Sequence, residues 1–145
     1  GPRQLLRHNR QGFIGWFVRL VMEGQQIQIY GDGAQRRDLN YVDDVVAAIL
    51  LAGEKDAAVG QVYNLAGDEP VSLKDLTERM IRIAGRGSFT LIPWPPEKKK
   101  IDIGDFYGDC AKITAELGWK PATSLDEGLK QTFDYYSGCL DKYLG

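Results

Sequence analysis

The stretch IYGDGAQRRDLNYVDD, residues 29–44, contains the strongest local signals of the chain. Residues 26–30, which run into it, alternate polar and apolar side chains, and this pattern predicts a short β-strand. The Gly-Asp-Gly sequence at 31–33 predicts a reversal, and Asp43 is placed to cap the helix that follows. Two adjacent arginines, at 36–37, stand between the turn and the helix, which raises the question of what anion they meet.

Length and composition predict one globular domain over residues 1–145. Charged residues make up 26% and hydrophobic residues 43% of the sequence, which is typical of globular proteins and not of disordered ones. The formal net charge of −2 gives no reason to expect nucleic acid or an anionic membrane as a partner. Any anion site must therefore be local.

Cysteine usage and hydropathy point to a cytoplasmic protein. The two cysteines, Cys110 and Cys139, have neither CxxC nor histidine spacing, so we expect reduced thiols and no zinc site. No secretory leader is visible. The longest apolar run, 45–52, is far shorter than the roughly 20 residues of a membrane helix.

Helices and short strands are predicted to alternate along the chain, which indicates an α/β fold. Proline at 93, 95 and 96 should hold the backbone extended. The expected helices cover 11–24, 43–53, 72–85 and 109–118 and begin again at 124, and the expected strands cover 26–30, 61–67 and 89–92.

Capping patterns fix several of these boundaries. Ser72 should cap its helix, with Val71 and Leu76 as a hydrophobic staple, and Ser124 with Glu127 has the spacing of a capping box. Asp109 and Gly118 should begin and end a short helix, and Leu125, Leu129, Phe133 and Tyr136 form an apolar stripe on the last one.

Two helices have too little polar surface for a self-contained domain of this size. Residues 13–22 and 45–52 are apolar on almost every side, and such helices need cover all round. We expect the chain alone to leave part of this surface uncovered.

Several motifs together resemble, in order, the carboxy-terminal part of the extended short-chain dehydrogenase/reductase family. Its members are NAD-dependent nucleotide-sugar epimerases, 4,6-dehydratases and decarboxylases with a Rossmann-type fold. The resemblance implies the C-terminal, substrate-binding half of such a protein. The motifs are GPRQLL at 1–6, GFIGWF at 12–17, IYGDGAQRRDLNYVDDVVAAILLA at 29–52, VYNLAGDEPVSL at 62–73, PPEKKKIDIGDFYGDCAKITAELGW at 95–119 and SLDEGLKQT at 124–132.

Two signatures of the family's redox chemistry do not occur in the 145 residues. No glycine fingerprint for a dinucleotide is present, and no tyrosine is followed four residues later by a lysine that could lower its pKa. By resemblance, both precede the segment with which this chain begins. The resemblance thus implies a half that lacks the dinucleotide-binding part, with NAD needed by the complete enzyme but none expected for this chain alone, and no catalytic or metal-binding residues.

The resemblance also answers the question about the arginines. The family's substrates are sugars linked through a diphosphate to UDP, dTDP or a similar nucleotide, and the fork of an arginine binds phosphate oxygens in bidentate fashion. Arg37 resembles the arginine that grips the diphosphate; the alternative is a surface arginine paired with Asp38 or Asp43. Arg36 is expected to be mostly solvated.

A second phosphate contact is expected from the lysine run at 98–100. Many relatives have an arginine there, and Lys99 aligns nearest to it. Lysine acts as a point charge without the fork, so this departure implies less control of orientation. A solvated loop is an equal alternative.

Further positions follow from the resemblance alone. Ile29 and Tyr30 resemble residues that contact the nucleotide base, although packing within a strand would explain them as well. Phe13 begins a helix that borders the nucleotide in relatives. Pro2 and Arg3 resemble a segment near the nicotinamide of NAD, which they could bind only with the rest of that pocket present.

Three functions remain open at this point. The chain is first of all expected to bind a nucleotide sugar as part of an epimerase or dehydratase, and to be inactive by itself. A second reading is a free-standing assembly module, in which a second copy covers the apolar helices as a homodimer. Nucleic-acid binding is the weakest, because no aromatic residues are interleaved with the basic clusters at 3–10 and 98–100. The single histidine, His8, is expected to be non-catalytic.

Overall fold

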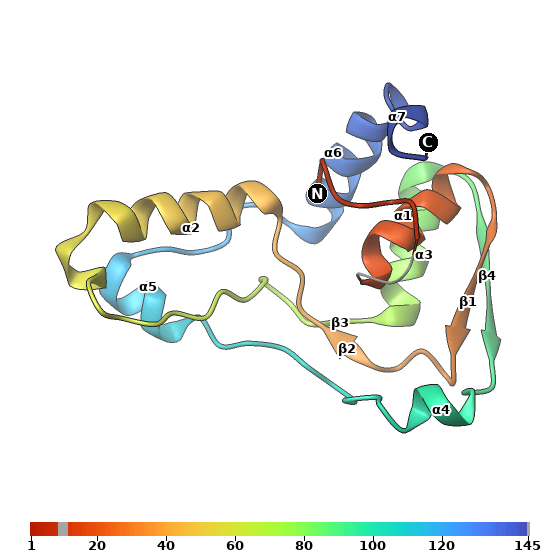
Figure 1. Cartoon of the computed structure of the whole chain (residues 1–145), viewed down its shortest axis with the longest axis horizontal. Coiled ribbons are helices and arrows are strands. Elements are labelled where there is room, and N and C mark those ends of the chain that lie inside the picture. The colour runs from red at the N-terminus through yellow and green to blue at the C-terminus, as the bar shows by residue number, and fades with distance from the viewer. Residues whose placement is uncertain (9–11, 145) are drawn as a thin grey trace.

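The computed structural model describes residues 1–8 and 12–144 and confirms a mixed α/β fold (Figure 1). Arg10, part of the basic cluster at 3–10, lies outside the described residues. The elements are α1 (Phe13–Met22), β1 (Gln26–Tyr30), β2 (Arg36–Arg37), α2 (Val42–Glu54), the short 3-10 helix η2 (Asp56–Ala58), β3 (Val71–Ser72), α3 (Leu73–Ala84), β4 (Ser88–Ile92), α4 (Pro96–Lys99), α5 (Ala111–Leu117), α6 (Leu125–Ser137) and α7 (Asp141–Leu144).

The strands form two small sheets. β1 pairs in parallel with β4, so that Tyr30 lies opposite Ile92 at their carboxyl ends. The reversal after β1 is present, with positive φ at Gly31 and Gly33, but it leads into another sheet: β2 pairs antiparallel with β3. The chain therefore turns away from β1 and carries the two arginines to the side of it (Figure 1).

Side-chain caps begin the helices, and glycines end them, largely as predicted. Ser72 Oγ accepts a hydrogen bond from Asp75 N at 3.0 Å, and Gly85 closes α3 in the left-handed conformation. Ser124 Oγ accepts from Glu127 N at 3.3 Å, whereas the Glu127 carboxylate accepts from Gln131. Only half of the predicted capping box is thus formed.

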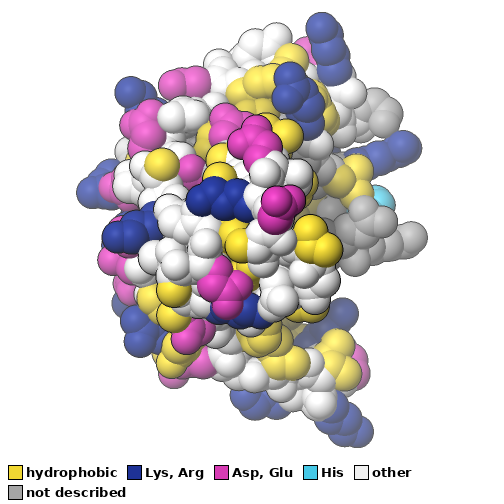
Figure 2. All heavy atoms as spheres, turned by 90° about the vertical axis from the view of Figure 1, so that its left-hand side faces the viewer, with side chains coloured by type: hydrophobic (Ala, Val, Ile, Leu, Met, Phe, Trp, Pro, Cys, Tyr) yellow, Lys and Arg dark blue, Asp and Glu magenta, His cyan; other side chains and the backbone are white. Residues whose placement is uncertain are grey.

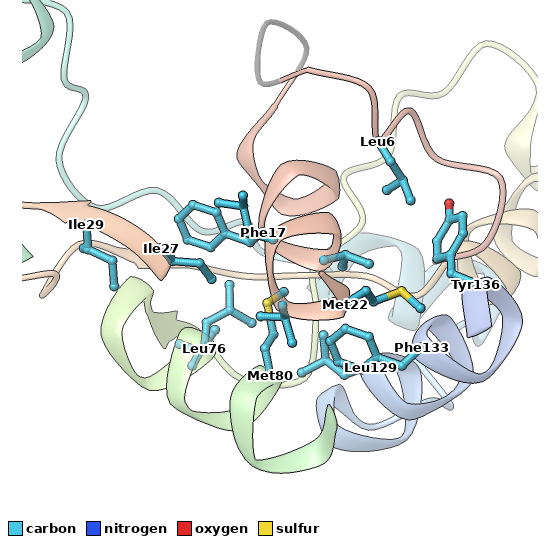
Figure 3. Packing of buried hydrophobic residues seen from close by; sticks show 14 residues of the cluster. Leu6, Phe17, Met22, Ile27, Ile29, Leu76, Met80, Leu129, Phe133 and Tyr136 are labelled. Carbon is cyan, nitrogen blue, oxygen red and sulfur yellow. The ribbon is translucent and has the colours of Figure 1, made fainter. Parts of the chain in front are cut away.

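The main hydrophobic core lies between α1, β1, α3 and α6 (Figure 3). Leu76 and Met80 from α3 face Phe133 and Leu129 from α6, and α1 lies over them. α1 buries six of its ten residues. The expectation that the helix at 13–22 would lack cover was therefore wrong, because β1, α3 and α6 pack around it.

α2 belongs to a second, smaller cluster with α5 at the other end of the molecule (Figure 1). Of its residues only Asp44 and Ala48 are buried, and Ile49 and Leu50 are 64% and 61% exposed. The expectation of an uncovered helix is confirmed here. We call the exposed large hydrophobic residues of this helix the α2 stripe: Val42, Val46, Ile49 and Leu50.

Three local predictions were wrong. Residues 61–67 form no strand, because β-propensity needs a neighbouring strand to pair with and the structure pairs this segment with none. Asp43 does not cap α2, which begins one residue earlier with Asp43 and Asp44 in its first turn. Pro96 is the first residue of the one-turn helix α4 rather than part of an extended run, since proline's fixed φ suits a helix start.

Candidate functional site

A cavity of about 520 Å³ opens beside β1 and brings together three of the predicted residues. Phe13, from the start of α1, lines it together with Ile29 and Tyr30 from the end of β1. Ile29 is also 1% exposed and belongs to the main core. We call this space the β1 cavity; it is lined by Phe13, Trp16, Phe17, Leu20, Gln25, Gln26, Gln28, Ile29, Tyr30, Gln35, Leu73, Trp94 and Lys98.

Aromatic rings make up much of the cavity wall. The rings of Tyr30 and Trp94 lie 5.2 Å apart, with their planes inclined by 38°. Phe13 packs edge-on against Phe17, 5.4 Å between centres. Offset and edge contacts of this kind hold aromatic side chains in defined positions, so the cavity has apolar surfaces against which a flat ring could stack.

Apart from the Tyr30 hydroxyl and the Trp94 N–H, the polar lining consists of amides and one cation. Four glutamines and Lys98 line the cavity, and within the described part of the chain no carboxylate does. Amides offer both donors and acceptors, whereas the ammonium group only donates. The arrangement can therefore bind a neutral or anionic polar ligand without repulsion from a carboxylate.

Arg37 lies two residues beyond Gln35 of the cavity lining. Its Nη1 donates to the carbonyl oxygens of Arg36 at 2.7 Å and Gly104 at 2.6 Å. These bonds fix one side of the guanidinium group. No hydrogen bond among the described residues uses Nε or Nη2.

The alternative reading of Arg37, an ion pair with Asp38 or Asp43, is not formed among residues 1–8 and 12–144. Asp38 instead accepts from Gly108 N at 3.1 Å. The cation is thus braced by neutral carbonyl groups and keeps donors for an outside anion. Arg36 is exposed and donates to Pro70 O at 3.2 Å.

Lys99 lies outside the cavity lining, on the same short helix as Lys98. Its Nζ is 3.2 Å from the carboxylate of Asp102, and the lysine side chain is 61% exposed. The same Nζ lies 4.9 Å from the centre of the Trp94 ring. The Asp102 side chain is only 9% exposed, so Lys99 is tied to a largely buried carboxylate rather than to a freely solvated one.

Pro2 and Arg3 are not part of the β1 cavity lining. Arg3 has a positive φ of 63°, and its guanidinium lies 6.0 Å from the ring of Tyr135 on α6. The neighbouring Gln4 is joined to Tyr136, whose hydroxyl accepts from Gln4 N at 2.7 Å. The structure thus places this segment against α6 and outside the lining of the β1 cavity.

A smaller cavity of about 150 Å³ lies between the amino-terminal segment and α6. Gln4 Oε1 and Asn40 Oδ1 are buried there without a partner among the described residues. Burial, reinforced by Asp43, Glu127 and Asp44, raises the pKa of Tyr41, which also lines it. The volume suits a few waters more than a nucleotide.

Trp94, Lys98 and the glutamines were not predicted from the sequence. One usable signal was the position of Trp94 between prolines, since a large aromatic residue on a restrained loop is a common recognition element. Glutamines carry no such signal. Of the described residues, no group of three or more histidines, cysteines and carboxylates could hold a metal ion, and no described helix has the length and hydropathy to cross a bilayer.

The surface at the α2 end carries charges of both signs. Figure 2 views the molecule from this side and shows Lys and Arg side chains interspersed with Asp and Glu, with hydrophobic side chains between them. Nucleic-acid binding calls for basic residues clustered on one face. This face offers no such surface.

Comparison with known proteins gives consistent matches. Residues 1–66 match the NAD dependent epimerase/dehydratase family. A dTDP-glucose 4,6-dehydratase of Streptomyces griseus is 33% identical over 94% of this chain and 39% of its own length. A UDP-glucose 4-epimerase of Mycolicibacterium smegmatis is 31% identical over 94% of this chain and 42% of its own.

Solved structures agree with these sequence matches. The UDP-glucose 4-epimerase of Thermotoga maritima with UDP-glucose superposes with a TM-score of 0.76 at 31% identity, over 92% of this chain and 42% of that one. The chain thus spans about two fifths of the length of its relatives. The motifs, the fold and these matches together make the chain similar to the NAD dependent epimerase/dehydratase family, whose model matches residues 1–66.

Proposed function

We propose that this chain binds the nucleotide-diphosphate part of a nucleotide sugar. The observation that carries the proposal is the guanidinium group of Arg37, which is braced by carbonyl groups and has no ion pair among the described residues. In the sequence, Arg37 follows Gln35 of the cavity lining by two residues. The relatives support it, because their names include UDP-glucose and dTDP-glucose as substrates.

The base would enter the β1 cavity, between Phe13, Ile29 and Tyr30. The diphosphate would then lie toward Arg37, with Lys99 as a second cation once it leaves Asp102. Such an arrangement fixes the position of the sugar rather than reacting with it, and positioning alone supplies much of the advantage of a bound reaction.

In a protein of the relatives' length, the sugar would be oxidised at C4 by hydride transfer to NAD, and the return of the hydride would complete an epimerisation. Pro2 and Arg3 would border the nicotinamide there. We propose that residues 1–145 act as one substrate-binding domain of a cytoplasmic protein, and that this chain alone neither binds NAD nor turns over a nucleotide sugar.

The test is calorimetric titration of the chain with UDP, dTDP and GDP and with their sugars, for the wild type and for Arg37→Ala. Loss of a charge-assisted bidentate contact should weaken binding by about 1.5 to 3 kcal/mol. Arg86→Ala, which removes an exposed arginine beyond the end of α3, is the matched control and should bind normally. Equal affinity for wild type and Arg37→Ala would remove Arg37 from the site.

The α2 stripe favours a second candidate, a homodimer in which another copy covers this helix. Ile49 and Leu50 are more than half exposed, and contiguous exposed apolar residues mark interaction surfaces. In this reading the chain is an assembly module without catalysis. Sedimentation at micromolar concentration tests the second candidate, because a monomeric chain would contradict a homodimer formed through the α2 stripe.

A further inference from the structure

The guanidinium group of Arg37 is held by a loop that lies far from it in the sequence. Arg37 Nη1 donates to Gly104 O at 2.6 Å and to Arg36 O at 2.7 Å. Phe106 N donates to Arg36 O at 3.1 Å, in the bridge that joins Phe106 to Arg37. The direction of the guanidinium group therefore depends on where this loop points the carbonyl of Gly104.

Asp102 fixes the same loop through its carboxylate. Its Oδ1 accepts a hydrogen bond from Gly104 N at 3.3 Å, and its Oδ2 lies 3.2 Å from Lys99 Nζ. An aspartate side chain typically fixes a turn in this way, by accepting from the amide two residues later. One largely buried carboxylate thus joins Lys99 to the piece of backbone that braces Arg37.

Gly104 connects the two interactions. Its N–H donates to Asp102 and its carbonyl accepts from Arg37. Its φ of +66° lies in the left-handed region that suits glycine, and an added Cβ would meet no atom within 4 Å. A change of φ at this position would therefore move the brace of Arg37 without any steric clash.

We infer that Asp102 is a positioning residue, which sets the direction of Arg37 through Gly104. The inference rests on the proposed function and adds to it a residue that acts through another one. The charge of Asp102 has the same sign as that of a diphosphate, so the charge alone would weaken the binding of an anion. Its contribution comes from the hydrogen bond to Gly104 N, which fixes Nη1 of Arg37 and so defines the direction of the remaining donors.

Two substitutions separate the charge of Asp102 from its hydrogen bond. Asp102→Asn and Asp102→Ala both remove the charge, but only asparagine keeps an oxygen that can accept from Gly104 N. The amide nitrogen of that asparagine then faces Lys99, so neither variant holds the ammonium group. The difference between the two variants thus reports the bond to Gly104.

Asp102→Asn should bind inorganic pyrophosphate about 2- to 10-fold more tightly than Asp102→Ala, as expected for one net hydrogen bond. Calorimetric titration of the wild type and both variants with pyrophosphate and with UDP measures the difference. Pyrophosphate is the sharper probe, because it carries the charge of the diphosphate without a base or a sugar.

A signal of Arg37 itself shows whether the effect passes through this side chain. The ¹H–¹⁵N signal of Arg37 Nε, assigned by its absence from Arg37→Ala, should stay in place in Asp102→Asn. In Asp102→Ala it should move toward that of a solvated arginine. This readout needs no ligand, and a merely structural role of Asp102 would leave the signal in place or displace backbone amide signals throughout the chain.

Gly104→Ala tests the same link from the backbone. Alanine strains the left-handed conformation and meets no atom, so this variant should weaken pyrophosphate binding and move the Arg37 signal as Asp102→Ala does. It carries the test if Asp102→Ala does not fold. Gly60→Ala is the matched control, since Gly60, just beyond η2, also has a positive φ of 72° and open space around an added Cβ. It should bind pyrophosphate like the wild type.

The failures can be told apart. Equal pyrophosphate affinities of Asp102→Asn and Asp102→Ala, or an Arg37 signal that stays in place in Asp102→Ala and Gly104→Ala, would overturn the inference and leave the proposed function standing. A Gly60→Ala variant that binds as weakly as Gly104→Ala would also overturn the inference, because the loss would then reflect strain anywhere in the chain. No binding of pyrophosphate or UDP by the wild type would overturn both.

Discussion

Gly31 illustrates how one residue shapes the candidate site. Its φ of +69° lies in the left-handed region, where a side chain costs about 1 to 2 kcal/mol. A Cβ there would also lie 2.4 Å from Trp94 Nε1. The residue thus turns the chain away from β1 and, by having no side chain, lets the indole pack against the turn.

Gly31→Ala should therefore lower the free energy of unfolding by at least about 1 to 2 kcal/mol and weaken UDP binding, because Trp94 must move. Urea unfolding and calorimetry measure the two effects. Gly53→Ala is the matched control: Gly53 lies within α2, with no atom that an added Cβ would meet within 4 Å, and alanine should stabilise the chain by up to about 1 kcal/mol. A Gly31→Ala variant as stable and as tightly binding as the wild type would contradict the described packing of the turn.

Tyr143 couples stability to pH near the carboxyl end. Its hydroxyl lies 2.6 Å from that of Tyr135. This hydrogen bond is the main cause, and burial the second, that raises the pKa of Tyr143 from 10.0 to about 12. The folded chain thus keeps a proton that the unfolded chain loses first. The stabilisation is complete below pH 10 and is lost as the pH rises toward about 12.

The free energy of unfolding should fall over this pH interval, and it should fall less for Tyr143→Phe than for the wild type. Burial also raises the pKa of Tyr41 and Tyr136, so part of the fall should remain in the variant. Chemical unfolding at several pH values, with tyrosinate absorbance recorded in parallel, gives both curves. Identical curves for wild type and variant would show that the hydroxyl pair does not set the pKa.

Among the helices, α2 and α1 show why local pattern and final burial differ. Both are apolar on most sides in the sequence, yet α1 is enclosed by α3 and α6, whereas α2 packs on one side against α5 and leaves the α2 stripe exposed. An apolar surface predicts that cover is needed. Which segment supplies the cover depends on contacts between residues far apart in sequence.

Replacement of Ile49 and Leu50 by lysine tests the exposure of the α2 stripe. Because both side chains are more than 60% exposed, the double variant should change the free energy of unfolding by no more than about 0.5 kcal/mol, and any self-association of the wild type should be lost in sedimentation. Ala48→Lys, on the buried side of the same helix, should destabilise the chain by about 3 to 5 kcal/mol as an uncompensated buried charge. Strong destabilisation by the double variant would mean that the stripe packs within the chain.

Elements whose ends are marked by signals within a few residues of sequence were predictable. The start of α3 at Ser72 and its end at Gly85 follow from a cap and a left-handed glycine that act within a few residues, and the same holds for the stripe of α6. Residues 61–67 failed because a strand needs a partner that the local sequence does not specify. The prediction that Asp43 caps α2 failed because the helix begins one residue earlier, at Val42. Helix boundaries are the least certain part of such predictions.

Over the whole chain, the candidate site could be predicted only in part. Family resemblance and the arginine–phosphate argument pointed to Arg37. Resemblance alone pointed to Ile29 and Tyr30, which the structure places in the cavity lining. Trp94 joins them through the parallel pairing of β1 with β4, residues 88–92. The paired residues are some sixty positions apart in sequence, and no local pattern predicts that they pair.

We expect a nucleotide diphosphate to bind across the β1 cavity and Arg37. Amide hydrogen exchange of the chain with and without saturating UDP can locate the ligand on the backbone without any substitution. Exchange should slow over residues 26–37 and 94–104 and stay unchanged in α5. Unchanged exchange in the first two segments, or slowing confined to α2 and α5, would contradict it.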